Sequence, residues 1–342
     1  MAIDFDKTGV SGEQTFDTFG CNVWHENPDT PDLVRADATF VRQVHSGGKV
    51  EMPDGRRIDF WSFLDPESNG PDGDKPFPSP IIRVKQGQVV HTQLKAGKNT
   101  HTIHHHGLDP TTFNDGVGHL SFEVSGNYVY QWRASQAGTY FYHCHKNTVL
   151  HFELGMYGAL IVDPPEGRGV AFAGGPRYDV EAIWVADDVD PVWHELNHSA
   201  GLCGEDVKLD QFRPQYFMIS GVPAPRTLTD PRIVIRAKPR QKILVRLINA
   251  SYSVLSATFP VNSTIIAVDG RGLGRAGSPW SRPIPVAKGT SVELTSAQRF
   301  DFLIDAPAAA GSYPVRLTFR DWATGDIQAG GRGIAESMII VA

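Results

Sequence analysis

The fold is indicated most clearly by two segments of the chain, GTYFYHCH at 138–145 and YGALIVD at 157–163. Each is a short run rich in aromatic and β-branched residues and bounded by turn residues, which is the pattern of a buried β-strand. Similar runs recur from residue 38 to the end, and helical periodicity is weak, the best candidate helix being 191–198. The sequence therefore predicts an all-β protein.

The strand runs form two series, separated by the turn-rich stretch DPPEGRG at 163–169. We expect an N-terminal extension over 1–37, a first domain over 38–166 and a second domain over 167–342. This division agrees with the usual size of roughly 100–200 residues per domain. Both domains are predicted to be antiparallel β-sandwiches, and the strand order shared by the two series indicates an internal duplication.

The composition excludes several classes of partner. The net charge is −6 and the chain is 41% hydrophobic, so it has no cationic surplus for nucleic acid or anionic lipid. No apolar run approaches the roughly 20 residues that cross a bilayer. The N-terminus shows no secretory signal pattern. Cys21 and Cys203 lie in glycine-flanked loop sequences, and the sequence leaves open whether they form a disulfide.

Histidines are concentrated in one part of the chain, where nine of the 13 lie between His91 and His151. Side chains alternate across a strand, so His143 and His145 share one face while Cys144 points to the other. The same alternation separates His101 from His104 and His106. If the two segments are neighbouring strands, two metal sites lie back to back.

The first predicted site combines His101 and Cys144 with His151 and Met156, which follow in the next loop. Two imidazoles, one thiolate and one thioether match a trigonal copper site with a weak axial methionine, which is an electron-transfer site. The second site would hold four imidazoles, suited to copper that meets water or dioxygen: His104, His106, His143 and His145. His105 is interpreted as lying outside both sets, as a supporting or solvent-facing residue.

The motif His-x-x-His-x-His-Gly at 101–107, with the later His-Cys-His, His and Met, resembles the ligand motifs of multicopper oxidases, laccase-like proteins built from cupredoxin domains. The resemblance covers most of the chain, including ILVRLINAS and IIAVDGRGL in the second domain, and it implies that both domains are cupredoxin-like Greek-key β-sandwiches. It implies a type 1 copper held by His101, Cys144, His151 and Met156. It also assigns His104 to a type 2 copper, and His106, His143 and His145 to a type 3 pair.

The resemblance further places Asp115 where many family members carry an acid that assists proton delivery during oxygen reduction. A turn-forming aspartate before glycine is the competing interpretation of Asp115. The family's trinuclear centre uses eight histidines from two domains, whereas the second domain here has only His194 and His198. A homo-oligomer that brings two first domains face to face would supply eight.

Two other interpretations of the motifs are weaker. Copper nitrite reductase is similar, but its motif resembles His-x-x-Asp-x-His, and His104 occupies the aspartate position. The run His194-Glu195-Leu196-Asn197-His198 matches the zinc protease signature His-Glu-x-x-His. Pro191 and Gly201 leave little room for the helix that this signature needs, so a short polar helix is expected instead.

Two functions follow from these expectations. The first is an oxidase that takes single electrons from a small reducing substrate, such as a phenol, an aromatic amine or a metal ion, and reduces dioxygen. His151 would be the point of electron entry, and Cys144 would link it to His143 and His145. The second is a blue copper protein that carries electrons or binds copper without catalysis. Copper chemistry favours a periplasmic or extracellular location.

Overall fold

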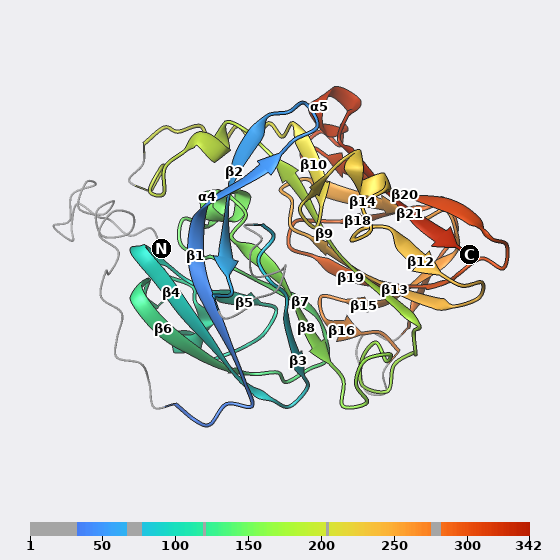
Figure 1. Ribbon diagram of the computed structural model, residues 1–342, viewed down its shortest axis with the longest axis horizontal. Coiled ribbons are helices and arrows are strands. Elements are labelled where there is room, and N and C mark those ends of the chain that lie inside the picture. Colours follow the sequence, from blue (N-terminus) through green and yellow to red (C-terminus); the bar gives the residue numbers. More distant parts are fainter. Residues whose placement is uncertain (1–32, 67–76, 119–120, 203–204, 275–281) are drawn as a thin grey trace, which may run out of the picture.

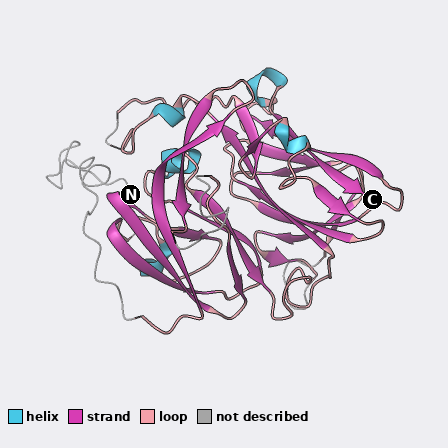
Figure 2. Cartoon of the chain, in the orientation of Figure 1, coloured by secondary structure: helices cyan, strands magenta, loops and turns pink. Residues whose placement is uncertain are grey.

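The computed structural model describes residues 33–66, 77–118, 121–202, 205–274 and 282–342. Strands dominate this part of the chain, and its helices are short turns (Figure 2). The prediction of an all-β protein is confirmed. Most of the predicted extension over 1–37, together with Cys21 and Cys203, lies outside the described residues. No described helix has the length and apolar character needed to cross a membrane.

The first unit, residues 38–163, consists of two four-stranded sheets, ordered β2-β1-β4-β6 and β3-β8-β7-β5. Its elements are β1 (Ala38–Glu51), β2 (Arg57–Leu64), β3 (Ile82–Lys85), β4 (Val89–His101), β5 (His104–His106), α3 (Thr112–Asp115), β6 (Val124–Arg133), β7 (Gly138–His143), α4 (Thr148–Glu153) and β8 (Tyr157–Asp163).

The second unit, residues 180–341, contains an eight-stranded sheet, β11-β10-β9-β13-β19-β15-β16 with β17 paired to β15, and a five-stranded sheet, β12-β21-β20-β14-β18. Its elements are β9 (Val180–Val189), η2 (Trp193–Glu195), β10 (Tyr216–Ile219), β11 (Val222–Pro223), η3 (Arg226–Leu228), β12 (Ile235–Ala237), β13 (Lys242–Asn249), β14 (Val254–Thr258), β15 (Ser263–Val268), β16 (Arg271–Gly272), β17 (Ile284–Val286), β18 (Ser291–Leu294), β19 (Arg299–Asp305), β20 (Gly311–Arg320), α5 (Gln328–Gly331) and β21 (Ile334–Val341).

The sheets differ from the expected antiparallel sandwiches in one respect. The pairs β1–β4 and β3–β8 are parallel, and so are β9–β13 and β12–β21. Parallel neighbours need a crossover connection, and each of these pairs joins strands that are separated by other elements in the sequence. The described units are therefore mixed sandwiches. The exact boundary between residues 166 and 167 stays a prediction.

The strands β7 and β8 lie at the centre of the molecule (Figure 1). Every residue of β7 and of β8 is buried. One reason is that β7 also contacts β13 and β19 of the second unit, so both faces of its sheet are covered (Figure 1). The amino-acid sequence of a strand buried on both faces is a nearly continuous apolar run. The two histidine-rich segments therefore end inside the protein, close to the junction of the two units.

A buried network of charged residues joins the two units. Arg83 of β3 pairs with Asp163 and with Glu181 of β9, each at 2.6 Å. Arg246 of β13 pairs with Glu181 at 2.7 Å and with Asp301 at 3.1 Å, and its Nη1 donates to the Thr139 hydroxyl at 2.9 Å. Because Thr139 belongs to β7, this network ties the first unit to the second.

Candidate metal centres

The first candidate centre lies where β4 and β7 end. The Cys144 Sγ atom is 3.4 Å from Nδ1 of His151 and 3.7 Å from Nδ1 of His101. All three residues are buried, and their ligand atoms lie within 4.8 Å of one another. The structure therefore brings together three of the four residues predicted for the type 1 site.

Strand register places the fourth residue, Met156, beside Cys144. The antiparallel pairing of β7 with β8 matches His143 to Tyr157, so one further step sets Cys144 opposite Met156. The Cys144 N–H donates to the Met156 carbonyl at 3.0 Å, which continues this ladder. Directly opposed residues project on the same face of a sheet, and Met156 is completely buried. A thioether is thus available on the Cys144 face.

A local turn returns His151 to the cluster. Asn147, with a φ of 42°, begins α4 in the left-handed region, and the helix then carries His151 back over Cys144. Such a backbone conformation is uncommon for residues other than glycine but is tolerated by asparagine. The short helix α4 is therefore the element that closes this centre.

Burial controls the protonation of this cluster. Loss of solvent raises the pKa of the Cys144 thiol to about 11. Burial, with a smaller effect of the His198 charge, lowers the pKa of His151 to about 3, and burial also lowers the pKa of His101. Two neutral imidazoles and a thiol thus face one another, and a soft cation is what would hold the thiolate form. The donor set fits copper, with sulfur and imidazole ligands together.

The second candidate centre lies on the opposite side of β7. The pairing of β5 with β7 sets His104 opposite His143, and His106 points to the same face two residues along. Nδ1 of His106 lies 3.3 Å from Nε2 of His143, and the ligand atoms of the three residues lie within 4.8 Å of one another. The His145 ring centroid is 5.4 Å from that of His104. The four predicted histidines therefore gather in one place.

The separation of His101 from His104 has a different cause from the alternation expected along one strand. His101 ends β4 in one sheet, and His104 begins β5 in the other, with Thr102 and Ile103 bridging the gap. The change of sheet, and not strand parity alone, sends the two imidazoles to different centres. The same two-residue crossing places both centres near the end of β7.

Asp115 lies beside His104. Its carbonyl accepts a hydrogen bond from Nδ1 of His104 at 2.7 Å, and its carboxylate oxygen lies 3.3 Å from the same nitrogen. Gly116 makes this approach feasible, because it has a φ of 70° and a Cβ there would lie 1.9 Å from the Ile103 carbonyl oxygen. Both interpretations of Asp115 are compatible with this geometry, since it ends α3 before a glycine and also contacts a predicted ligand.

A cavity of about 240 Å³ opens at the second centre. The first unit lines it with all four histidines, and the second unit lines it with Tyr252, Ser296 and Ala297. The Tyr252 hydroxyl donates to the Val149 carbonyl at 2.7 Å. The described part of the second unit therefore adds no histidine to this cavity.

His105 points away from both centres. Its Nε2 atom lies 3.0 Å from the Thr92 hydroxyl, and its ring packs against Trp132. Burial lowers the pKa of His105 to about 3. It is thus a core residue and not solvent-facing, and its environment agrees with a place outside the two ligand sets.

The zinc protease signature does not assemble. Its helix ends after the 3₁₀ turn η2, because Leu196 returns to an extended conformation with ψ 149°. His194 is buried, with Nδ1 donating to the Asp59 carbonyl at 2.5 Å and Nε2 lying 3.5 Å from Glu153. His198 instead lies against the first centre, 4.6 Å from His151 between ring centroids. His194 and His198 therefore lie in different parts of the structure and do not face one metal site.

The structure argues against direct contact between a substrate and His151, the expected point of electron entry. His151 is completely buried, and its Nε2 atom donates to the His198 carbonyl at 2.9 Å. Sequence reasoning missed this cover because the segment that provides it comes from the second unit. The apolar residues Trp193 and Leu196 within a polar loop were the available signal.

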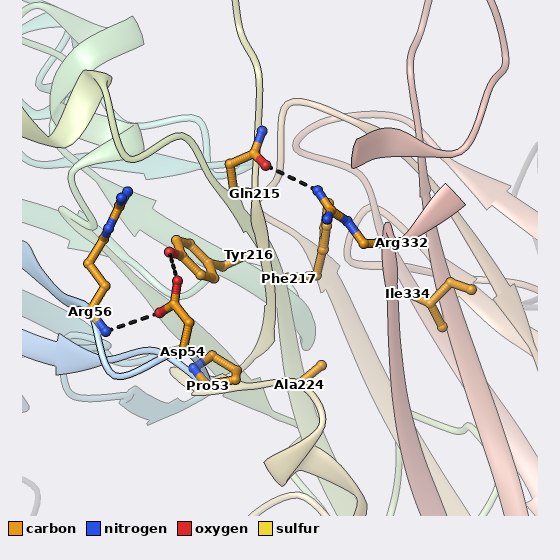
Figure 3. Close-up of a pocket in the computed structure, with 9 residues that line it drawn as sticks. All are labelled: Pro53, Asp54, Arg56, Gln215, Tyr216, Phe217, Ala224, Arg332 and Ile334. Atoms are coloured by element: carbon orange, nitrogen blue, oxygen red, sulfur yellow. Dashed lines mark hydrogen bonds between the residues drawn. The ribbon is translucent and has the colours of Figure 1, made fainter. Parts of the chain in front are cut away.

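A wide groove of about 570 Å³ lies apart from both centres, between the turn joining β1 to β2 and the second unit (Figure 3). The Tyr216 hydroxyl donates to Asp54 at 2.8 Å, and Arg332 donates to Gln215 at 3.3 Å across its wall. None of the predicted ligands lines this groove.

Comparisons with known proteins agree with the copper-ligand motifs. Residues 68–167 match the family model described as multicopper oxidase. L-ascorbate oxidase from Cucumis sativus is 34% identical over 154 residues, which are 42% of this chain and 24% of that protein. Copper resistance protein A from Escherichia coli is 38% identical over 124 residues, which are 35% of this chain and 19% of that protein. The chain thus spans a quarter or less of these two relatives.

Solved structures share the fold over most of the chain. Blue copper oxidase from Nitrosomonas europaea superposes with a TM-score of 0.67 at 23% identity, covering 89% of this chain and 86% of that one. Copper nitrite reductase from the same organism gives a TM-score of 0.61 at 18% identity, covering 89% and 94%. These likenesses show a shared cupredoxin architecture.

Proposed function

We propose that this chain, whose residues 68–167 match the multicopper oxidase family model, is a copper-dependent oxidase that transfers single electrons from a small reducing substrate to dioxygen. The substrate class is a phenol, an aromatic amine or a metal ion. The observation that carries the proposal is the pair of donor sets at the two sides of β7, one buried and one lining a cavity, joined by the sequence His143-Cys144-His145. Bound copper would supply one-electron redox chemistry and oxygen binding.

The ligands of the proposed copper ions are assigned from their positions. His101, Cys144, His151 and Met156 would hold the type 1 copper. His104, His106, His143 and His145 would hold the copper ions of the second centre. Hydrogen bonds orient several of these rings: Nδ1 of His143 donates to the Cys144 carbonyl at 2.8 Å, and Nδ1 of His145 lies 3.0 Å from the Thr148 hydroxyl. Such outer hydrogen bonds fix the tautomer and orientation of a ligand.

Asp115 is proposed to assist proton transfer at the second centre. Its carboxylate is partly exposed while its oxygen lies 3.3 Å from His104. A carboxylate in that position can take a proton from solvent and present it beside the histidine cavity. The role of Asp115 as a helix-ending residue is compatible with this function.

The shortage of histidines supports an oligomer. The cavity has four histidines from the first unit and Tyr252, Ser296 and Ala297 from the second. We propose a homo-oligomer in which a second copy presents its own histidines to the same centre. In an isologous contact, the same surface patch of both subunits lies at the interface, so four histidines become eight. The copper ligands would then lie near a subunit interface.

A blue copper protein that carries electrons is the second candidate, and the shortage of histidines at the second centre favours it. With one chain providing half of the family's histidine set, the first centre alone would carry an electron without oxygen chemistry. A nitrite reductase-like enzyme is less well supported, because His104 stands where that motif has its aspartate.

Metal analysis separates these candidates. Purified protein loaded with copper and freed of excess metal is expected to retain more than two copper ions per chain and to consume oxygen with a phenolic or Cu(I) donor. Close to one copper per chain without oxygen uptake would favour the carrier. Nitrite reduction without oxygen uptake would favour the third candidate. The oligomeric state, measured by light scattering on the same sample, tests the shared centre.

A further inference from the structure

A segment of the second unit covers the outer edge of the first centre. We call residues 193–200 the cap. After β9 the chain crosses to the first unit, and Figure 1 shows this excursion in yellow-green beside α4. Trp193 and Ala200 of the cap form one apolar cluster with Leu150 and Leu154 of the first unit. This packing holds the cap in place over α4, which carries His151.

His198 is the cap residue that reaches the centre. Its ring centroid lies 4.6 Å from that of His151 and 4.9 Å from that of His101. Nε2 of His198 donates to the Thr100 carbonyl at 3.1 Å, and its Nδ1 lies 3.1 Å from the Ser199 hydroxyl. Both ring nitrogens are therefore engaged in hydrogen bonds, and the ring covers the centre without joining its ligand set.

The cap backbone also accepts hydrogen bonds from His151 of α4 and from Asn147, which precedes that helix. The His198 carbonyl accepts from Nε2 of His151 at 2.9 Å. The Asn147 side-chain amide donates to the same carbonyl at 3.3 Å and to the Ala200 carbonyl at 3.0 Å. His151 is thereby held in the tautomer whose Nδ1 lone pair faces Cys144.

Trp61 of β2 completes the cover. Its ring centroid lies 5.3 Å from that of His151, and it stacks on His198 at an interplanar angle of 17°. His101, Cys144 and His151 are buried, whereas Trp61 and His198 are each partly exposed. A molecule arriving from solvent at this face therefore meets the surface of Trp61 and His198 before it can reach a ligand of the centre.

We propose that His198 determines donor access at the first centre, so that reducing substrates react by outer-sphere electron transfer at the surface formed by Trp61 and His198. This inference rests on the proposed function, since it takes the centre to hold copper. In the step, the donor would lose one electron and bound Cu(II) would accept it to become Cu(I). A metal complex would change only its oxidation state, whereas a phenol would also release its O–H proton to solvent. The substrate class is one with a stable one-electron oxidation product, such as a phenol or a metal complex.

A copper-free experiment tests the cover itself. Methyl methanethiosulfonate, a small thiol reagent, forms a mixed disulfide with Cys144 and releases methanesulfinate, and peptide mapping separates Cys144 from the other cysteines. Cys144 in the His198→Ala protein is expected to react with this reagent several-fold faster than in wild type. Its rate of reaction with a bulky aromatic disulfide reagent should rise only slightly. His198→Phe, which keeps a ring, and His45→Ala, a partly buried histidine outside both centres, should react like wild type. Equal rates for wild type and His198→Ala would overturn the proposal, and so would acceleration of both reagents alike.

A copper-loaded experiment tests electron transfer. Loss of the Cu(II)–thiolate absorption is followed without oxygen after mixing with dithionite, whose reductant is the small sulfur dioxide radical anion, or with bulky hexacyanoferrate(II). His198→Ala should accelerate reduction by the small donor and slow reduction by the bulky one, and His198→Phe should change neither much. If His198→Ala changed both reduction rates in the same direction, or changed neither, the role of His198 would be contradicted. A wild-type protein without this absorption would contradict the proposed function instead, and the thiol experiment would still test the cover.

Discussion

Replacing His104 and His106 together by alanine is expected to reduce oxygen consumption to the uncatalysed level while leaving the Cu(II)–thiolate absorption intact. The two histidines face His143 across β5 and β7, on the side of β7 opposite Cys144. Their loss removes two of the four imidazoles of the oxygen-binding centre, yet no ligand of the first centre changes. The measurement is oxygen uptake together with a visible spectrum on the same copper-loaded sample.

The matched control for this prediction is His45→Ala, a histidine of the first unit that belongs to neither cluster. It should leave both oxygen uptake and the absorption unchanged. If the His104→Ala, His106→Ala protein still consumes oxygen at the wild-type rate, the second centre is not the site of oxygen reduction. If the absorption disappears as well, the two centres are not the independent sites that β7 separates.

Arg246→Leu is expected to lower the free energy of unfolding by about 3–5 kcal/mol, the usual cost of removing one partner from a buried ion pair. Arg246 is completely buried and contacts Glu181, Asp301 and Thr139. Burial raises the pKa of Asp301 despite the Arg246 charge beside it. Burial would also raise the pKa of Glu181, but hydrogen bonds and charges of Arg83 and Arg246 lower it. Leucine would leave both carboxyl groups without the guanidinium between them.

Denaturant unfolding of copper-free protein, followed by circular dichroism, measures this loss. The matched control is Arg316→Leu, since Arg316 pairs with Glu336 at 2.9 Å on the exposed side of β20 and β21. An exposed pair contributes about 0–1 kcal/mol, so this control should unfold close to wild type. Equal destabilisation by the two substitutions would show that the Arg246 network does not hold the units together.

The strands, and the placement of Cys144 and His143 on opposite faces, could be predicted from the sequence because they depend on local rules. Alternation along a strand separates Cys144 from His143, and β7 with its neighbours realises this separation. The apolar runs of β7 and β8 indicated burial, and they are buried throughout. Copper chemistry then followed from residue types at known spacing, and the family match over 68–167 agrees with it.

The cover of the first centre could not be predicted in this way. His198 lies 47 residues after His151, and its position depends on how an excursion of the second unit packs on α4. Local patterns gave His194 and His198 a shared helix, but the chain becomes extended at Leu196 and sends them to different sites. Parallel strand pairs were missed for a related reason, because long crossovers leave no signal in local periodicity.

The visible spectrum of copper-loaded protein, recorded for wild type and for Cys144→Ser, tests whether Cys144 binds copper as a thiolate between His101 and His151. Wild type should show an intense Cu(II)–thiolate absorption, and Cys144→Ser should lack it while remaining folded. A wild-type protein without the absorption, or a Cys144→Ser protein that retains it, would contradict the assignment of this centre.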